Sequence, residues 1–226
     1  TDILVTSIKI NGRAVPLNMS LLDIGEDGNG GTKISTVDPY TVMETSIFEA
    51  VLKVFMEETK GVTRIPSVEP FKYCISSKNL GSARVGPPVP SIDLGLHDES
   101  VSWRIFGVNS MMHVKDVVLC LGFVDGGSNP RTSVVIGGHQ LEDNLLEFDL
   151  VKRRLGFIST LLFMQTTCAN FNSTSSVKEV ETLVSKKRDD LFGQLREFEG
   201  LPNSTIYAPA WDSINIDTPD GEIVTS

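Results

Sequence analysis

The alternation of hydrophobic and polar positions along residues 1–170 predicts many short β-strands. The runs with this pattern are DILVTSIKI (2–10), SWRIFGV (102–108), DVVLCLGFV (116–124), TSVVIGG (132–138), LLEFDL (145–150) and RLGFIST (154–160). Stretches rich in Gly, Pro, Asn or Asp lie between strands: INGRA (10–14), EDGNGG (26–31), VGPPVPS (85–91) and DGGSNP (125–130). Strands and turns at this spacing favour an all-β barrel or sandwich-like fold over a parallel α/β sheet.

One amphipathic helix is predicted near residues 43–59. Its apolar stripe has helical spacing and would pack on a sheet: Ile47, Val51, Val54 and Phe55. Asp38 is the expected N-cap, with Pro39 in the first turn, and Gly61 is the expected stop.

The composition changes after Asn172. Residues 173–200 alternate blocks of charge with apolar residues at mostly helical spacing, which predicts an exposed amphipathic helix. Residues 201–226 have no clear periodicity. We therefore divide the chain into a domain of residues 1–172 and a charged, helical C-terminal appendage, 173–226, which is either a genuine extension or the product of a gene-model fusion or readthrough.

Charge and length exclude some classes of partner. The 226 residues carry a net charge of −9, which argues against nucleic acid or an anionic membrane as the main partner. No run approaches the roughly 18 apolar residues of a membrane helix. Residues 1–8 lack the features of a signal peptide, and the chain starts at Thr1, so we expect a processed chain, a fragment or an incomplete gene model.

Cysteines and possible glycosylation sites favour a secreted chain. The cysteines are Cys74, Cys120 and Cys168, an odd number that suggests a disulfide partner elsewhere. Asn18, Asn172 and Asn203 each begin an Asn-X-Ser/Thr tripeptide. No cluster has the spacing of a metal site, and no phosphate-binding loop is present, so no metal and no cofactor are predicted.

Five segments carry a resemblance to a known family: GGTKISTVDPYTVMETSIFEAV, SARVGPPVPSIDLGL, NSMMHVKDVVLCLGFVDGG, SVVIGGHQLEDNLLEFDLVKRRLGF and TTCANFN. Over roughly residues 3–174 the chain resembles the C-terminal lobe of the plant pepsin-like inhibitor group. That group includes extracellular dermal glycoprotein, xyloglucan-specific endoglucanase inhibitors, xylanase inhibitors, basic 7S globulin and gamma-conglutin. The resemblance implies the all-β, pepsin-like aspartic protease fold, of which only the second lobe is present, and secretion to the plant cell wall or apoplast.

The resemblance also implies the disulfide pattern. Cys74 and Cys120 would form a bridge within the lobe, and Cys168 would bridge to the absent N-terminal lobe. The alternative for Cys168 is a buried free cysteine. Because pepsin-like lobes share a sheet and an apolar face, we expect residues 1–172 alone to be marginally stable or prone to aggregation.

The stretch GGTKISTV resembles the loop that carries the second catalytic Asp of an aspartic protease, with that Asp replaced. It places Ser35 at the carboxylate, Thr36 next, and Val37 at the glycine. Two carboxylates must share one proton in this chemistry, and a serine hydroxyl cannot do so. Asp38 lies three positions further on, beyond the tolerance of a catalytic arrangement, and is expected to cap the helix instead. We therefore expect that this lobe does not support aspartic protease catalysis.

The resemblance implies that a loop of this lobe plugs the cleft of a glycoside hydrolase. Arg131 matches the cleft-plugging arginine, presented by a turn that includes Asn129 and Pro130. A guanidinium can span the paired carboxylates of a glycosidase. The alternative is an ordinary arginine on a hairpin tip. Arg64 and Arg84 are candidates for a second inhibitory element, or ordinary surface charges.

The remaining polar residues have modest expected roles. His139 can hydrogen-bond within the Ser35 region, His113 is assigned no role, and Glu142 and Asp143 are expected on a turn that faces solvent. The predicted function is inhibition of an endoglucanase or xylanase. The alternatives are a storage or signalling globulin of the basic 7S type and an active aspartic endopeptidase.

Overall fold

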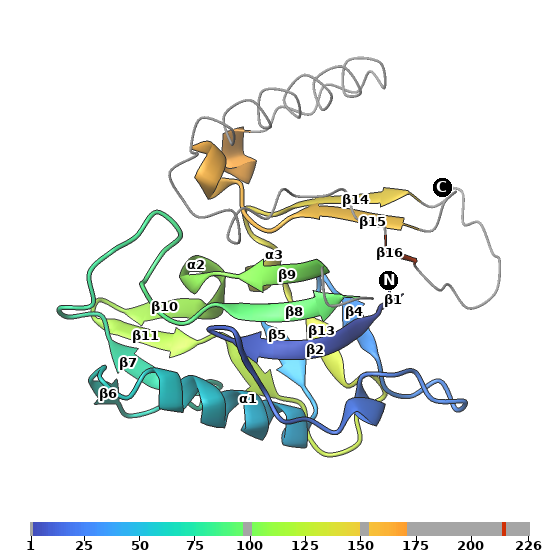
Figure 1. Cartoon of the computed structure of the whole chain (residues 1–226). Helices are drawn as coiled ribbons and strands as arrows, with labels where there is room; N and C mark the ends of the chain where they lie inside the picture. Colours follow the sequence, from blue (N-terminus) through green and yellow to red (C-terminus); the bar gives the residue numbers. More distant parts are fainter. Residues whose placement is uncertain (1, 97–100, 150–153, 171–213, 216–226) are drawn as a thin grey trace.

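The computed structural model describes residues 2–96, 101–149, 154–170 and 214–215. In this part of the chain four small sheets surround one hydrophobic core, with a single long helix below them in Figure 1. The molecule is therefore an all-β lobe with few and mostly short helices. Two predictions, the helix at 173–200 and the glycosylation sites Asn172 and Asn203, lie outside the described residues.

The first sheet contains both parallel and antiparallel neighbours. Its order is β1 (Asp2–Ile3), β4 (Thr32–Ile34), β13 (Val134–Ile136), β5 (Thr41–Met43) and β12 (Phe123–Asp125). Strand β13 is parallel to β4 and antiparallel to β5. The loop after β4 and the loop before β13 therefore leave this sheet at opposite ends.

The other three sheets are antiparallel. One is β3 (Arg13–Ala14), β2 (Val5–Ile10), β8 (Ile92–Leu96) and β9 (Val101–Ile105). Another is β10 (Met111–Lys115), β11 (Val118–Leu121), β7 (Cys74–Ser76) and β6 (Arg64–Ile65). The last is β14 (Leu145–Asp149), β15 (Arg154–Ile158) and β16 (Ile214–Asn215), so a short piece of the 173–226 segment pairs with the lobe.

The other helices of the lobe are short. They are α2 (Gly107–Ser110), α3 (Gly138–Leu141) and the 3₁₀ turns η1 (Met19–Leu21), η2 (Leu162–Met164) and η3 (Cys168–Asn170). No helix in the described ranges has the length and apolar character needed to cross a membrane.

The strand predicted over 116–124 is two strands in different sheets. The chain turns at Gly122, between β11 and β12. A Cβ on this glycine would lie 3.2 Å from the His139 ring and 3.3 Å from the Gln140 amide nitrogen. Gly122 therefore marks a corner where the backbone passes close to α3, which a hydrophobic pattern alone does not reveal.

The long helix α1 spans Thr45–Glu58, close to the predicted 43–59, but the predicted N-cap, Asp38, is wrong. Residues 41–43 continue as β5, so Asp38 cannot cap the helix. Glu44 is the N-cap instead, and its carboxylate accepts from the backbone N–H groups of Ser46 (2.8 Å) and Ile47 (3.2 Å). The helix ends at Thr59, before Gly61, where the Thr59 hydroxyl donates to the carbonyl of Phe55.

The predicted apolar stripe of α1 faces the core. Ile47, Val51, Val54 and Phe55 are all buried, and the helix packs against β2 and β12. Trp103 on β9 connects the core to the β14–β15 hairpin, because its ring stacks on Phe157 (5.6 Å) and its indole N–H donates to Asn144. Packing, rather than helix propensity, thus fixes the position of α1.

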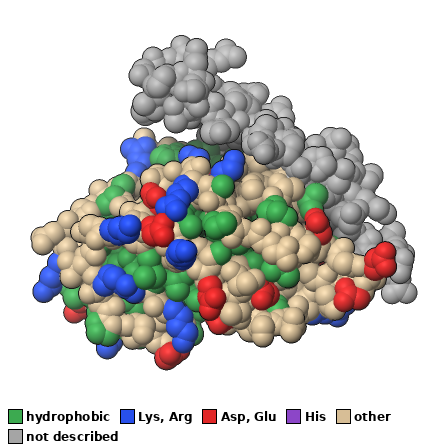
Figure 2. Space-filling view, turned by 60° about the horizontal axis from the view of Figure 1, so that its bottom comes forward, with side chains coloured by type: hydrophobic (Ala, Val, Ile, Leu, Met, Phe, Trp, Pro, Cys, Tyr) green, Lys and Arg blue, Asp and Glu red, His purple; other side chains and the backbone are tan. Residues whose placement is uncertain are grey.

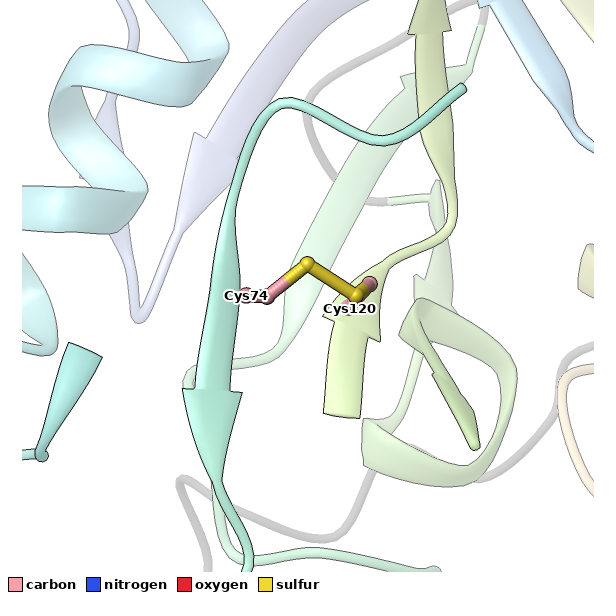
Figure 3. Close-up of a disulfide and its surroundings, with 2 residues drawn as sticks. All are labelled: Cys74 and Cys120. Carbon is pink, nitrogen blue, oxygen red and sulfur yellow. A yellow bond between two sulfur atoms is a disulfide. The ribbon is translucent and has the colours of Figure 1, made fainter. Parts of the chain in front are cut away.

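Cys74 and Cys120 form a disulfide between directly opposed positions of β7 and β11 (Figure 3). Both residues are buried. The bridge closes a loop of sequence separation 46 and ties the sheet that carries β6 together.

We predict that replacing both Cys74 and Cys120 by Ala lowers the free energy of unfolding by about 4 kcal/mol, because the loop is no longer closed in the unfolded chain. Urea denaturation followed by circular dichroism measures this difference. Cys168→Ser is the matched control, since Cys168 is an exposed free thiol and its loss should change stability little. Equal destabilisation by the control would contradict the assignment of the bridge.

Candidate functional site

The Ser35 loop, residues 35–40, follows β4 and is closed by its own side chain. The Ser35 hydroxyl oxygen accepts from the backbone N–H groups of Val37 (3.3 Å) and Asp38 (3.2 Å). The backbone N–H of Ser35 donates to the Ile136 carbonyl at 2.9 Å. Ser35 thus acts as a turn-closing residue.

The segment that follows β13 holds the other side of the Ser35 loop. The N–H groups of Gly138 and His139 donate to the carbonyls of Asp38 (2.7 Å) and Pro39 (3.0 Å). Gly137 passes so close to Tyr40 that a Cβ would lie 2.3 Å from its carbonyl carbon. Only glycine fits at position 137, whereas a Cβ on Gly138 would make an ordinary contact of 3.6 Å with the Asp38 carbonyl oxygen.

The buried amide of Gln140 links three segments of the chain next to the Ser35 loop. Its oxygen accepts from the backbone N–H and the hydroxyl of Thr41, both at 2.8 Å. Its nitrogen donates to the carbonyls of Asn109 (2.9 Å) and Gly122 (3.0 Å). Gln140 is fully buried and its amide has a partner for each of its four hydrogen bonds, so it positions β5, α2 and the Gly122 corner together.

The tip of the Ser35 loop faces solvent. Thr36 and Val37 are exposed, Val37 by 89%. The Asp38 carboxylate has neither a hydrogen bond nor an ion pair with the described residues, and the Asp38 carbonyl accepts from the N–H of Gly138. The tip thus presents one hydroxyl and one apolar side chain to solvent.

The Arg131 loop, residues 125–133, connects β12 to β13 and is anchored to the start of α1. The Asp125 carboxylate accepts from the Thr45 hydroxyl (2.7 Å) and from the Gly127 N–H (2.9 Å). These two donors, the hydroxyl first, hold the pKa of Asp125 below its usual range. The Glu44 N–H donates to the Ser133 carbonyl, which fixes the other end of the loop.

The tip of this loop presents Arg131 to solvent. Asn129 has φ of +106° and Gly127 of +85°, so the chain reverses over a few residues. Arg131 is exposed, and it forms no ion pair with any residue in the described ranges. Its guanidinium is therefore free to meet a carboxylate on another molecule.

The Arg131 and Ser35 loops lie at opposite ends of the β4–β13 pair. The Arg131 carbonyl accepts from Gly30, whereas the Ile136 carbonyl accepts from Ser35. These two hydrogen bonds lie on either side of the parallel β4–β13 pairing, which extends from Thr32 and Val134 to Ile34 and Ile136. The structure therefore does not bring Arg131 together with the Ser35 loop.

The other candidate arginines lie elsewhere. Arg64 is on β6, with its guanidinium 5.1 Å from the centre of the Tyr73 ring. Arg84 is exposed, next to a bridge between Ala83 and Gly86. His113 is exposed on β10.

His139, Asp143 and Cys168 surround the entry to the β14–β15 hairpin. The His139 ring is nine-tenths buried, and burial lowers its pKa, although Glu142 at 3.4 Å favours the charged form. Glu142 faces solvent as expected, but Asp143 does so only in part, because its carboxylate accepts from the Cys168 N–H at 2.8 Å. The thiol of Cys168 is free and exposed in this structure.

Asn18 is exposed at the start of η1, where its side-chain oxygen accepts from the hydroxyl and the N–H of Ser20. Its amide nitrogen has no hydrogen-bond partner among the described residues. Among the described residues, no group of three or more His, Cys, Asp or Glu side chains could hold a metal ion.

These features define a lobe of the pepsin-like type, in which glycine-rich loops leave a mixed sheet at both ends. Residues 2–159 match the family described as xylanase inhibitor C-terminal, and the chain belongs to that family. The fold is the C-terminal lobe of a pepsin-like protein.

Known proteins similar to the chain match over most of its length. It is 62% identical over 171 residues to "Probable aspartic proteinase GIP2" of Nicotiana benthamiana, a match that covers 76% of this chain and 39% of that protein. A solved structure, that of edgp, superposes with a TM-score of 0.75 at 60% identity, over 77% of this chain and 43% of that one. Basic 7S globulin from soybean superposes with a TM-score of 0.63 at 34% identity, over 76% and 43% of the two chains. The chain thus spans about two fifths of the length of the proteins it matches.

We predict that Gln140→Met, which keeps the side-chain volume but removes the amide, lowers the free energy of unfolding by about 3 kcal/mol or more. The change leaves the Thr41 N–H and the Asn109 and Gly122 carbonyls buried without partners. Urea unfolding measures the loss, and Ser67→Ala, at an exposed position, is the control. A loss no larger than that of the control would show that the Ser35 loop is held in another way.

We also predict that acid loosens the Arg131 loop. The pKa of Asp125 is lowered by its hydrogen bonds, so their contribution is present above the ordinary Asp value, about 3.9, and disappears as the pH falls through the lowered value. The amide resonance of Gly127 should titrate with a midpoint below that ordinary value. Asp125→Asn should abolish the titration, whereas a midpoint at or above the ordinary value would contradict the anchoring.

Proposed function

We propose that the chain is the C-terminal lobe of a secreted, catalytically inactive pepsin-like protein that inhibits a cell-wall-degrading glycoside hydrolase, an endoglucanase or a xylanase. The observation that carries the proposal is Arg131, which is exposed on an anchored loop and forms no ion pair with a described residue. The family description, xylanase inhibitor C-terminal, supports the same class of partner.

The anchoring of the loop is what makes Arg131 suitable for this role. A loop that is already ordered loses little conformational entropy on binding. Asp125 and the Ser133 carbonyl fix both ends of the loop to the start of α1. The planar guanidinium can donate to both members of a catalytic pair of carboxylates, which retaining glycosidases hold about 5 Å apart.

An inactive protease scaffold agrees with the structure of the Ser35 loop. Our alignment places Ser35 at the position of the second catalytic Asp, and there its hydroxyl oxygen closes a turn. Although one similar protein is named a probable aspartic proteinase, a dyad needs a carboxylate from each lobe. We therefore propose that this chain does not support peptide hydrolysis, and that the partners it requires are an N-terminal lobe, bridged through Cys168, and the target hydrolase.

A storage or signalling globulin is the second candidate. Its support is the superposition on basic 7S globulin from soybean, which extends over as much of the chain as the match to edgp. The two candidates differ in whether the Arg131 loop has a target.

We predict that Arg131→Ala raises the inhibition constant for the target hydrolase by about 30-fold or more, because a buried carboxylate pair loses its cation. Arg131→Lys should have an intermediate effect, since an ammonium group lacks the fork of donors. The measurement is inhibition of a xyloglucan endoglucanase and of a xylanase by the chain co-expressed with an N-terminal lobe of the family. Lys115→Ala is the control, an exposed cation on β10.

The possible results of these measurements distinguish the candidate functions. Unchanged inhibition by Arg131→Ala would remove this residue from the mechanism. No inhibition of either class of enzyme by the parent protein would favour the globulin. Acid-dependent cleavage of a protein substrate would restore the peptidase.

A further inference from the structure

A cleft of about 550 Å³ lies between the second half of α1 and the corner formed by β6 and β7. We call it the α1 cleft. Among the residues that line it are the apolar side chains of Leu52, Met56 and Val62 and the ring of Tyr73. Its other lining residues are mostly charged, and three of them are cations: Lys53, Lys60 and Arg64.

The floor of the cleft is apolar and well supported. Leu52 and Met56 are one helical turn apart on α1, are half-buried, and pack against the core. Tyr73 is 2% exposed, and its hydroxyl lies 2.6 Å from that of Thr59. The ring therefore supports the floor from beneath, and Leu52 and Met56 provide the apolar surface that a ligand can reach.

The rim of the cleft has an excess of unpaired positive charge. Arg64 lies over the Tyr73 ring, and Lys53 and Lys60 are exposed. None of the three forms an ion pair with a described residue. The acidic residues of the rim are Glu49 and Glu57, and Glu57 is held by Arg13 at 2.7 Å.

Arg13 pairs with one of the two acidic residues of the rim. It lies on β3, contacts both Glu57 and Glu58, and lowers the pKa of Glu57 through its hydrogen bond. The cations of the cleft remain available for a carboxylate from outside. On the face of the molecule that carries α1, hydrophobic side chains lie exposed between Lys and Arg side chains (Figure 2).

We propose that the α1 cleft binds an acidic segment of a partner polypeptide that carries a leucine-type side chain, with that side chain on Leu52 and Met56 and flanking carboxylates on Arg64, Lys53 and Lys60. Charge complementarity selects this partner, because the whole chain has a net charge of −9 and yet leaves three cations unpaired around one apolar floor. Strand β6 is the outer strand of its sheet, so an extended segment can lie along it.

This surface is separate from the Arg131 loop. That loop is anchored at the start of α1, and the cleft lies along its second half. The 14 residues of the helix span about 21 Å at 1.5 Å per residue. Loss of hydrolase inhibition and loss of peptide binding can therefore be measured independently.

The test uses the full chain and a fluorescein-labelled peptide in which glutamate alternates with leucine. Fluorescence anisotropy should show saturable binding that weakens as salt rises, and a matched peptide with glutamine in place of glutamate should bind much more weakly. Arg64→Glu and Lys53→Glu should each weaken binding about five-fold or more. Lys115→Glu makes the same change of charge on β10, at the opposite edge of the same sheet, and should have no comparable effect.

A second measurement locates the peptide on the molecule. Its addition should shift the amide resonances of Met56, Val62 and Tyr73, and Met56→Gln should weaken binding without unfolding the chain. Equal binding of the glutamine peptide, an equal effect of Lys115→Glu, or shifts elsewhere would overturn the proposal. So would binding only to anionic vesicles, or a concentration-dependent dimer that Arg64→Glu abolishes.

Discussion

The arrangement of the loops depends on the buried amide of Gln140. One side chain holds Thr41, Asn109 and Gly122, which lie on three separate segments of the chain. Because all of its hydrogen bonds are made within the protein, none depends on an acid at the end of β4. The hydrogen bonds of Gln140 therefore hold the segments around the Ser35 loop without a contribution from the side chain at position 35.

The mixed sheet holds the Ser35 loop and the Arg131 loop apart. Parallel pairing of β4 and β13 places the loops that flank them at opposite ends. The Ser35 end is closed by backbone hydrogen bonds and a tightly packed glycine, whereas the other end presents an arginine that forms no ion pair with the described residues. The binding function proposed for Arg131 therefore does not involve the Ser35 loop.

The sequence was most informative where a local pattern coincides with tertiary burial. The apolar stripe of α1 predicted the helix and its buried face, since Ile47 and Val51 do pack on a sheet. The N-cap of the helix was mispredicted because Asp38-Pro39 has the chemistry of a cap, while the pairing of β5 with β13 and β12 extends the strand to Met43. Pairing between distant segments outweighed a local preference, and no window of sequence contains that information.

The candidate site could likewise be predicted only in part from the sequence. The residue types around Arg131 predicted an exposed turn, and Asn129 and Gly127 do reverse the chain there. The sequence could not show that Asp125 anchors this turn to α1, because Asp125 and Thr45 are 80 residues apart. Nor could it show that Gln140, in an unremarkable Gly-His-Gln-Leu stretch, fills a buried position.

For the binding of an acidic partner, the local distribution of charge matters more than the net charge of the chain. A net charge of −9 keeps an acidic ligand away on average, so an acidic partner requires a place where cations are concentrated and unpaired. At the rim of the α1 cleft, Arg13 pairs with Glu57, while Lys53, Lys60 and Arg64 form no ion pair with a described residue. A carboxylate of a bound partner would therefore meet three cations and one unpaired acidic side chain, Glu49, at this rim.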